Sequence, residues 1–480
     1  MLIFNMIIDG KSVTSEQTFD VVNPALGVPF AKCALGDVNT VDIAVASAKK
    51  SFTGWSQLPD EVRVEKMHAI VGLLESNMPE MMALITQENG KPLNGFCGIG
   101  SGMEVGGAMA WIQATSSYSL PMEVIQDNDE ARIELHRKPL GVVASITPWN
   151  WPLLIAIWHV IPALKTGNTV IIKPSSFTPL STMRFVELAN TVLPPGVLNV
   201  VTGGANVGNA ISQHPDINKI VFTGSTAIGK KIMSLSSSNL KRLTLELGGN
   251  DAGIVLPDVD VKAIASNLFL SCFHNNGQTC ACLKRLYVHE SIYDDVCREL
   301  AKIANNVKVG NGLESDTDLG PIQNKAQLEK VIELTKDALA NGASLIAGGK
   351  AKEGDGYFFP PTIIGDISDG TRLVDEEQFG PVLPIIKYTD VDEVINRANK
   401  NENGLGGSIW SSNIDLAYSL ASRLETGSVW INEHGTVQPN APFGGTKQSG
   451  IGLTFGQQGI EEFTSVQTIK VSKVNASKCP

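Results

Sequence analysis

Three side chains in the sequence are of the types needed for acyl chemistry: a thiol, a carboxylate and an amide. Cys280 follows the polar, glycine-containing segment 275–279, so it could reach a cleft and act as a nucleophile if its thiolate is stabilised. Glu246 ends an apolar run before a glycine pair, where loss of water would make it a useful general base. Asn150 lies in the turn TPWNWP, where a rigidly held amide could donate to a developing oxyanion.

Each of these residues also has an ordinary structural explanation. A lone cysteine is more often a small buried residue, a glutamate at a strand end usually faces solvent, and a turn asparagine usually serves the turn. Cys282, two residues after Cys280, raises the alternative of metal or redox chemistry. No histidine or second cysteine pair has the spacing of zinc ligands, so the sequence predicts no metal site.

Alternating strand and helix patterns indicate how these residues are positioned. The chain begins with a predicted hairpin that turns at Asp9-Gly10. Apolar residues at helical spacing follow over residues 42–87, and Pro59 is expected to separate two helices within that stretch. Strands and helices then alternate on both sides of Gly248-Gly249, which predicts two α/β halves with parallel sheets. We expect strands at 169–173, 197–201, 217–223, 252–256 and 286–289. We expect helices at 207–213, 226–235, 292–307 and 324–341, and one more that ends near residue 275. A further helix should follow Thr178 and Pro179, with Thr178 as its N-cap and Pro179 in its first turn.

A phosphate site is expected where residues 222–226 join a strand to a helix. Free amides at a helix start bind anions, and glycine allows a close approach of the ligand. The segment is not a GxGxxG fingerprint, and an ordinary strand–turn–helix connection would look similar. Lys173 ends its strand, at the edge where open α/β sheets bind ligands, although a solvated lysine is the simpler explanation.

Composition limits the classes of function. The chain has 480 residues, 43% of them hydrophobic and 18% charged, which indicates a globular protein of two or three domains. A formal charge of −11 argues against nucleic-acid or anionic-membrane partners. Seven cysteines, an odd number, argue against a disulfide framework, and the N-terminus lacks the pattern of a signal peptide. We therefore expect a soluble, cytoplasmic protein that does not enter membranes.

Seven motifs together carry a resemblance to a known family. TPWNWP, GNTVIIKPS, FTGST, LELGGND, GQTC, EEQFGPV and PFGG occur in the order and at spacings similar to the aldehyde dehydrogenase superfamily. The resemblance implies an α/β fold with a Rossmann-like cofactor domain (1–117 and 138–247), an α/β catalytic domain (248–445) and a small β oligomerisation flap (118–137 and 464–480). It also implies a homodimer or homotetramer.

The same resemblance assigns catalytic roles. Cys280 would be the nucleophile, Asn150 and the Cys280 amide would form the oxyanion hole, and Glu246 would activate water. An aldehyde would then be oxidised to its carboxylic acid through a thioester.

For the cofactor, NAD or NADP, the resemblance implies a set of residues around a bound dinucleotide. These are Pro148, Trp149, Lys173, Ser176, Gly204, Gly208, Thr223, Ser225, Leu247, Glu377 and Phe379. The resemblance places Trp149 and Ser225 near the pyrophosphate, Lys173 at the adenosine ribose, Gly204 and Gly208 on the adenine side, and Glu377 at the nicotinamide ribose with Phe379 beside it. Many NAD-preferring relatives carry a glutamate where Ser176 stands, so its absence makes NADP use plausible. A carboxylate that relatives often hold behind the general base is replaced by Leu453-Thr454, so Thr454 or water would relay the proton from Glu246.

The aldehyde tunnel implied by the resemblance is aromatic and largely neutral. Its expected lining is Trp151, Ile155, Trp158, His274, Thr279, Val437 and Phe443. Because these stretches hold no arginine to pair with a carboxylate, aromatic or other apolar aldehydes are favoured over semialdehydes that carry an acid group.

Three other functions remain to be weighed. A CoA-acylating relative would not need the base Glu246. A cysteine hydrolase or thioesterase would need a histidine partner, and none stands in a recognisable motif. A non-enzymatic structural protein would have no use for Cys280, Glu246 and Asn150 together.

Overall fold

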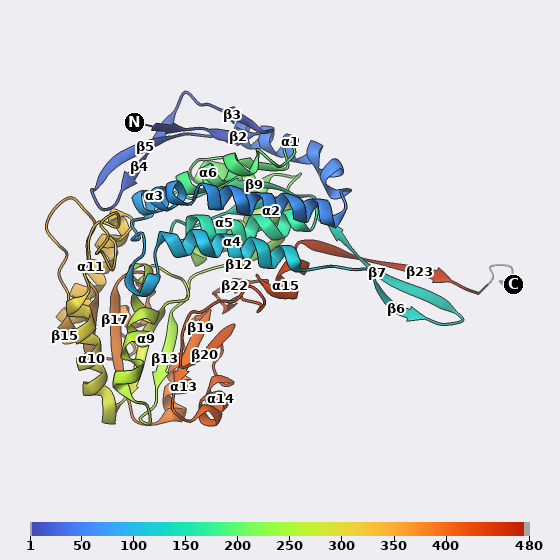
Figure 1. Ribbon diagram of the computed structural model, residues 1–480. Helices are drawn as coiled ribbons and strands as arrows, with labels where there is room; N and C mark the ends of the chain where they lie inside the picture. Colours follow the sequence, from blue (N-terminus) through green and yellow to red (C-terminus); the bar gives the residue numbers. More distant parts are fainter. Residues whose placement is uncertain (1, 475–480) are drawn as a thin grey trace.

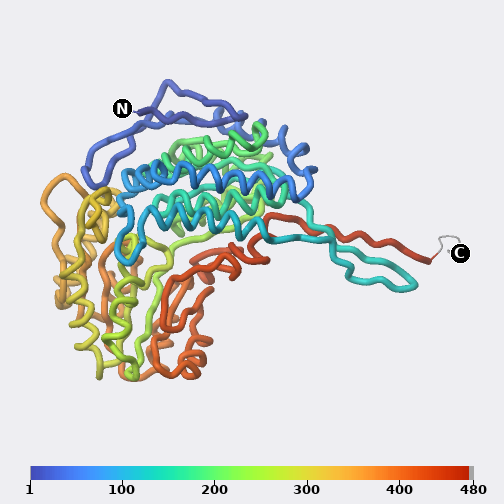
Figure 2. Tube along the Cα trace, viewed as in Figure 1, coloured from blue at the N-terminus to red at the C-terminus, as the bar shows by residue number. Residues whose placement is uncertain are grey.

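Two α/β lobes and a projecting β arm make up the chain. The computed structural model describes residues 2–474 (Figure 1). The first lobe contains the N-terminus, the second lies below it in Figure 1, and the arm extends away from both. The trace in Figure 2 shows that the arm is built from segments far apart in sequence.

The first lobe is organised around an eight-stranded sheet in the order β22-β12-β11-β8-β9-β10-β2-β3. Its five central strands are parallel, and antiparallel strands complete both edges. The strands are β2 (Met6–Ile8), β3 (Lys11–Val13), β8 (Val142–Ile146), β9 (Thr169–Lys173), β10 (Leu198–Val200), β11 (Lys219–Thr223), β12 (Arg242–Glu246) and β22 (Gly450–Ile451).

Helices cover both faces of this sheet. Helices α1 (Val38–Ser56), α7 (Ala205–Gln213) and α8 (Thr226–Leu235) supply one apolar layer. The other layer comes mainly from α2 (Asp60–Ser76), α3 (Met78–Asn89), α4 (Ser101–Ser117), α5 (Pro152–Lys165) and α6 (Leu180–Ala189). A small sheet of β1 (Leu2–Phe4), β4 (Thr18–Asn23) and β5 (Val28–Ala34) and the short helix α15 (Gly456–Glu461) belong to the same lobe.

The second lobe repeats the design with a seven-stranded sheet in the order β15-β16-β17-β14-β13-β19-β20. All neighbours are parallel except β15 and β16. Its strands are β13 (Asp251–Val255), β14 (Leu283–His289), β15 (Ser344–Ala347), β16 (Thr362–Ile367), β17 (Val382–Tyr388), β19 (Gly406–Trp410) and β20 (Ser428–Ile431), with β18 (Asn403–Gly404) and β21 (Thr446–Lys447) forming a separate pair. Its helices are α9 (Val261–Phe273), α10 (Tyr293–Asn306), α11 (Lys325–Ala340), α12 (Arg372–Asp375), α13 (Val391–Asn399) and α14 (Ile414–Ala421).

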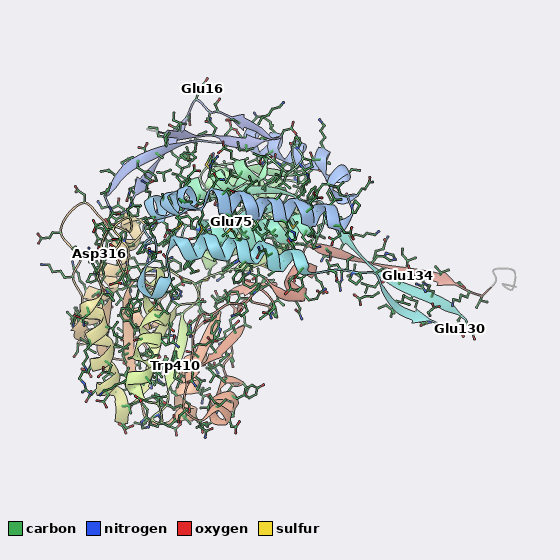
Figure 3. The ribbon with its side chains drawn as sticks, viewed as in Figure 1. Glu16, Glu75, Glu130, Glu134, Asp316 and Trp410 are labelled. Atoms are coloured by element: carbon green, nitrogen blue, oxygen red, sulfur yellow. The ribbon has the colours of Figure 1, made fainter. Side chains whose placement is uncertain are left out.

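The arm is an antiparallel sheet of three strands. These are β6 (Glu123–Asp127), β7 (Ala131–Pro139) and β23 (Thr464–Ser472), and β7 lies in the middle. Figure 3 places Glu130 and Glu134 on this arm, away from both lobes. Residues 475–480 of the predicted flap, including Cys479, lie outside the described residues.

The expected strands and helices are confirmed, with ends displaced by a few residues, except that the stretch 42–87 holds three helices: it breaks at Asn77, just before Pro79, as well as at Pro59. The predicted Thr178 cap of α6 is wrong. The Thr178 hydroxyl instead donates to the Trp149 carbonyl oxygen at 3.2 Å. The α6 amides of Leu180 and Ser181 donate to the buried Glu88 carboxylate from α3, at 2.6 and 2.9 Å. The two oxygens of one carboxyl group accept both free amides at once, which a single hydroxyl cannot do, so a distant residue replaces the local cap.

None of the helices among residues 2–474 is long and apolar enough to cross a membrane.

Candidate active site

Parallel strands of the first lobe bring predicted residues to one edge. Glu246, Thr223 and Lys173 are the last residues of β12, β11 and β9, and the TPWNWP turn directly follows β8. These four strands are neighbours in the order β12-β11-β8-β9. Thr223 pairs with Glu246, and Ile146 pairs with Lys173. Their carboxyl ends therefore form a single edge, where sheets of this kind bind ligands.

The Cys280 segment is shaped by an unusual turn. Asn275, Asn276 and Gly277 all have positive φ angles, of 50°, 56° and 73°. Asparagine and glycine tolerate this left-handed backbone better than other residues. A side chain at Gly277 would place its Cβ 2.3 Å from the Gly380 carbonyl oxygen, so the close approach of the two segments requires glycine. This turn ends α9 and delivers Cys280 to the cleft between the lobes.

Half-buried Cys280 lines a pocket of about 1140 Å³, a volume that includes its opening to solvent. All seven residues predicted for the aldehyde tunnel line the same pocket. The lining also includes Trp111 and Leu154 from the first lobe and His434 and Thr436 from the second. The thiol thus meets a largely apolar chamber large enough for a small organic substrate.

The electrostatic surroundings of the thiol oppose its ionisation in the free protein. Burial raises the pKa of Cys280 to about 12, and the nearby Glu246, Asp251 and Glu377 carboxylates act in the same direction. Lys284 counters them by lowering the pKa. The thiolate therefore depends on local positive charge and hydrogen-bond donors.

Glu246 is a buried carboxylate with few partners. Burial raises its pKa well above the ordinary value, and the Thr454 hydroxyl, 3.5 Å from Oε1, partly opposes that shift. Within the described residues, its buried Oε2 accepts no hydrogen bond. A Cβ at Gly444, next to the pocket residue Phe443, would lie 3.5 Å from Oε1, so the carboxylate lies beside the pocket wall. These are the properties of a general base.

Asn150 is buried, and its side-chain amide donates to the Gln278 carbonyl oxygen at 2.9 Å. This contact places the amide against the backbone two residues before Cys280. An amide has a second N–H, which is the group available to a substrate oxyanion.

The backbone of Asn150 is held by residues that the sequence did not single out as site residues. Its carbonyl oxygen accepts from Lys91 Nζ and Asn275 Nδ2, both at 2.9 Å, and from Asn89 Nδ2 at 3.3 Å. Lys91 is also paired with the buried Glu104, which accepts the first amides of α5. These contacts link the end of α3, α4 and the turn before Cys280 to the backbone of Asn150.

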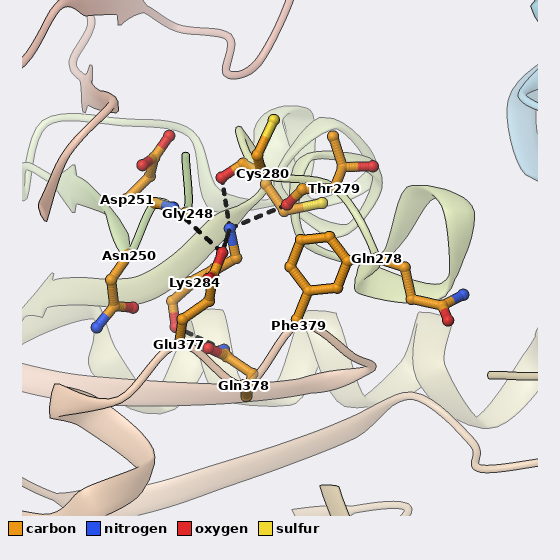
Figure 4. Close-up of polar contacts among 12 residues, drawn as sticks. Gly248, Asn250, Asp251, Gln278, Thr279, Cys280, Lys284, Glu377, Gln378 and Phe379 are labelled. Atoms are coloured by element: carbon orange, nitrogen blue, oxygen red, sulfur yellow. Dashed lines mark hydrogen bonds and ion pairs between the residues drawn. The ribbon is translucent and has the colours of Figure 1, made fainter. Parts of the chain in front are cut away.

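Trp149, predicted near the pyrophosphate, lies against Phe379, predicted beside the nicotinamide ribose. The Trp149 and Phe379 rings make an edge contact with centroids 5.2 Å apart. Glu377 accepts the Gly249 amide at 3.2 Å. A Cβ at Gly248 would lie 2.4 Å from Glu377 Oε2, so a larger residue there would displace the carboxylate. Figure 4 shows Glu377 and Phe379 beside the Cys280 segment.

The remaining predicted cofactor residues lie along the strand edge. Ser176 donates to the Gly203 carbonyl oxygen at 3.2 Å, Gly204 precedes α7, and Gly208 lies within that helix. Ser225 precedes α8, Leu247 packs against Gly229 of the same helix, and Pro148 lies in the turn after β8.

Two observations show that this edge fits a dinucleotide. Lys173 is buried, its ammonium donates to Pro174 O at 3.3 Å, and burial lowers its pKa to about 8. A buried cation with hydrogen-bonding capacity to spare suits ribose hydroxyls or a phosphate. The Ser225 side chain makes no capping bond to α8, so the first amides of that helix face an anion site without a local acceptor.

Comparisons with known proteins agree with this arrangement. The aldehyde dehydrogenase family matches residues 11–469. Phenylacetaldehyde dehydrogenase from Pseudomonas fluorescens is 40% identical to this chain, and the match covers 97% of this chain and 95% of the relative. Human retinaldehyde dehydrogenase 3 is 37% identical, and the match covers 95% of this chain and 90% of the relative. The NAD+ complex of an aldehyde dehydrogenase from Bacillus cereus superposes on this chain with a TM-score of 0.95 at 34% identity, and the match covers 98% of this chain and 96% of that one. The chain therefore belongs to the aldehyde dehydrogenase family, whose members oxidise aldehydes to carboxylic acids with NAD(P)+.

Proposed function

We propose that this NAD(P)-dependent aldehyde dehydrogenase oxidises aromatic and other apolar aldehydes through a thioester on Cys280. The observation that carries the proposal is the pocket in which Cys280 meets all seven predicted tunnel residues. The Asn150 amide contacts the Cys280 segment at the Gln278 carbonyl oxygen. The Glu246 carboxylate lies near enough to the Cys280 thiol to act on its charge.

Cys280, Asn150 and Glu246 have different roles in the proposed reaction. The Cys280 sulfur bonds to the aldehyde carbon, and the carbonyl electrons move to oxygen, where Asn150 donates a hydrogen bond. When bound, the nicotinamide would accept the hydride released as the thioester forms. Glu246 then takes a proton from water, whose oxygen bonds to the acyl carbon while the carbon–sulfur bond breaks and the thiolate leaves.

The pocket supports an apolar substrate. Its lining, all within the described residues, contains no lysine or arginine, and Trp111, Trp151, Trp158 and Phe443 provide aromatic walls. Burial lowers the pKa of His274 to about 4 and also lowers the pKa of His434, so both are neutral near pH 7. A substrate carboxylate would lose its water without gaining a cation. One of the relatives is a phenylacetaldehyde dehydrogenase, which agrees with this preference.

An aldehyde panel tests the substrate class. We expect kcat/KM for phenylacetaldehyde to exceed that for succinic semialdehyde by about 100-fold, since an unpaired carboxylate costs several kcal/mol on burial. The measurement is initial NAD(P)H formation at pH 7.5 with aliphatic, aromatic and carboxylate-bearing aldehydes. A higher kcat/KM for the semialdehyde would contradict the proposed pocket chemistry.

Both cofactors are expected to support turnover. Ser176 is neutral and bonded to the Gly203 carbonyl, so no carboxylate at that position repels a 2′-phosphate. We expect kcat/KM for NAD+ and NADP+ to agree within about tenfold, because tenfold corresponds to only about 1.4 kcal/mol. A strong preference for NAD+ in side-by-side kinetics would disprove this relaxed specificity.

We propose that Thr454 relays protons from Glu246 and helps keep it ionised. The single Thr454 hydroxyl proton has two acceptors in reach, Glu246 Oε1 at 3.5 Å and the Phe443 carbonyl oxygen at 3.1 Å, so the hydroxyl stabilises the carboxylate when it turns toward Glu246. Removing it in Thr454→Val should raise the Glu246 pKa further, so the acidic limb of the kcat profile should move to higher pH. We expect kcat at pH 6 to fall about fivefold, the equivalent of one hydrogen bond, with little change at pH 9. Unchanged pH–rate profiles, with Thr454→Ser as the control, would remove Thr454 from this role.

The domain assignment and the assembly are also proposals. Residues 1–117 and 138–247 would form the cofactor domain, 248–445 the catalytic domain, and the arm an oligomerisation flap in a dimer or tetramer. Val124, Ile125, Val466 and Val471 expose apolar side chains on the arm, which supports its burial by another subunit. Six free cysteines within residues 2–474 fit a reducing compartment, and we propose a cytoplasmic location.

A further inference from the structure

Lys284 is a buried cation directly behind the nucleophile. It lies at the start of β14, four residues after Cys280, and is 2% exposed. Its ammonium donates to the Thr279 carbonyl oxygen at 2.9 Å and to the Cys280 carbonyl oxygen. It also forms an ion pair with Glu377 Oε1 at 3.2 Å. Figure 4 shows Lys284 between the Cys280 segment and Glu377.

The three contacts account for the three hydrogens of an ammonium group. Burying such a charge is costly unless it is paired and hydrogen-bonded, and here both conditions are met. Burial alone would lower the pKa of Lys284, but the Glu377 and Asp251 carboxylates outweigh it and the net pKa is raised. Lys284 therefore stays protonated throughout the physiological range.

The position of Lys284 connects two parts of the proposed mechanism. On one side it holds consecutive carbonyls of the segment that carries the thiol. On the other it restrains the Glu377 carboxylate, which among the described residues also accepts the Gly249 amide and which is expected to bind the nicotinamide ribose. When a cofactor is bound, its distance from the nucleophile would thus be set partly by one side chain.

The positive charge of Lys284 also favours the ionised form of the Cys280 thiol. Of the charged groups that act on the Cys280 thiol, Glu246, Asp251 and Glu377 are acidic and disfavour the thiolate, whereas Lys284 favours it. Cys282, His274 and His434 also face the Lys284 charge, and burial disfavours the ionised form of each. Without Lys284 the thiol would face three carboxylates with no opposing cation among these groups.

We infer that Lys284 is a positioning residue that ties the Cys280 segment to Glu377 and supplies the positive charge behind the nucleophile. The inference rests on the proposed function, because it assumes that Cys280 reacts and that Glu377 contacts the cofactor.

The test is the alkylation of Cys280 by iodoacetamide, followed by peptide mass spectrometry from pH 6.5 to 10 on the full-length protein without cofactor. Lys284→Met should react about tenfold more slowly at pH 8, with its pH–rate curve displaced to higher pH. Lys284→Arg should react within about threefold of wild type because it keeps the charge. Lys284→Met should also weaken NAD+ binding about fivefold, as measured by fluorescence titration.

Lys219→Met is the matched control, because Lys219 is also a buried lysine. It contacts Thr244 and Glu462 at the start of β11, whereas the candidate site lies at the end of that strand. It should leave Cys280 alkylation unchanged. If Lys284→Met does not fold, Lys284→Gln, which keeps hydrogen-bond donors but no charge, serves instead and should show the same displacement. Wild-type alkylation and NAD+ affinity in the folded neutral variant would overturn the inference. Aldehyde oxidation that survives complete alkylation of Cys280 would instead overturn the proposed function, so the two failures are distinguishable.

Discussion

Cys280→Ala is expected to lower aldehyde oxidation about 10⁴-fold or more, while NAD+ affinity stays within about twofold of wild type. The alanine cannot form the bond to the aldehyde carbon, and no other described cysteine lines the pocket. Most residues expected to bind the cofactor lie at the strand edge of the first lobe, and removing the Cys280 sulfur leaves their side chains unchanged. Steady-state NADH formation and fluorescence titration of NAD+ measure the two quantities.

Cys282→Ala is the control for this variant. Cys282 is buried beside His274, with sulfur–nitrogen distances of 3.7 Å, and does not line the pocket. It should retain most of the activity. Near-wild-type oxidation by Cys280→Ala, or an equal loss in Cys282→Ala, would contradict the assignment of the nucleophile.

Glu246→Gln is expected to separate acylation from hydrolysis. An amide of the same size cannot take a proton from water, so the thioester should form and then persist. Mixing enzyme, NAD+ and phenylacetaldehyde in a stopped-flow instrument should give a burst of about one NADH per active site. A steady rate at least about 100-fold below wild type should follow.

The size of that burst distinguishes the possible outcomes. A slow rate without a burst would mean that Glu246 acts before the thioester, and an undiminished steady rate would exclude it as the base. The acidic limb of the wild-type kcat profile should lie above the ordinary range of glutamate. Burial raises the Glu246 pKa, and activity is lost as the pH falls through that raised value.

Local patterns predicted β9, β10, β11, β13 and β14, but not β8, β16, β17, β19 or β20. Thr223 and Glu246 each follow a short apolar run and precede glycine, which marks the carboxyl end of a buried strand. Parallel pairing then brings such ends together, as the pairing of these two residues shows. The tunnel residues could be placed because the family resemblance supplied the relation between segments that are distant in sequence, and all seven line the pocket.

Long-range polar partners could not be predicted in this way. Glu88 replaces Thr178 at the start of α6 although about ninety residues separate them, and no local pattern encodes that contact. Lys91, in the loop after α3, contacts the Asn150 carbonyl, and no local pattern encodes that contact either. Lys284 was inconspicuous because a lysine beginning a strand is usually solvated, and only the packing of Glu377 against the Cys280 segment makes it a buried ion pair.

Peptide mass spectrometry of Glu246→Gln, quenched in acid after one turnover with NAD+ and phenylacetaldehyde, tests the central claim most directly. The account predicts a phenylacetyl group on the peptide containing Cys280, released by hydroxylamine and absent without NAD+. An unmodified Cys280 in a sample that has formed stoichiometric NADH, or acylation at another residue, would contradict it.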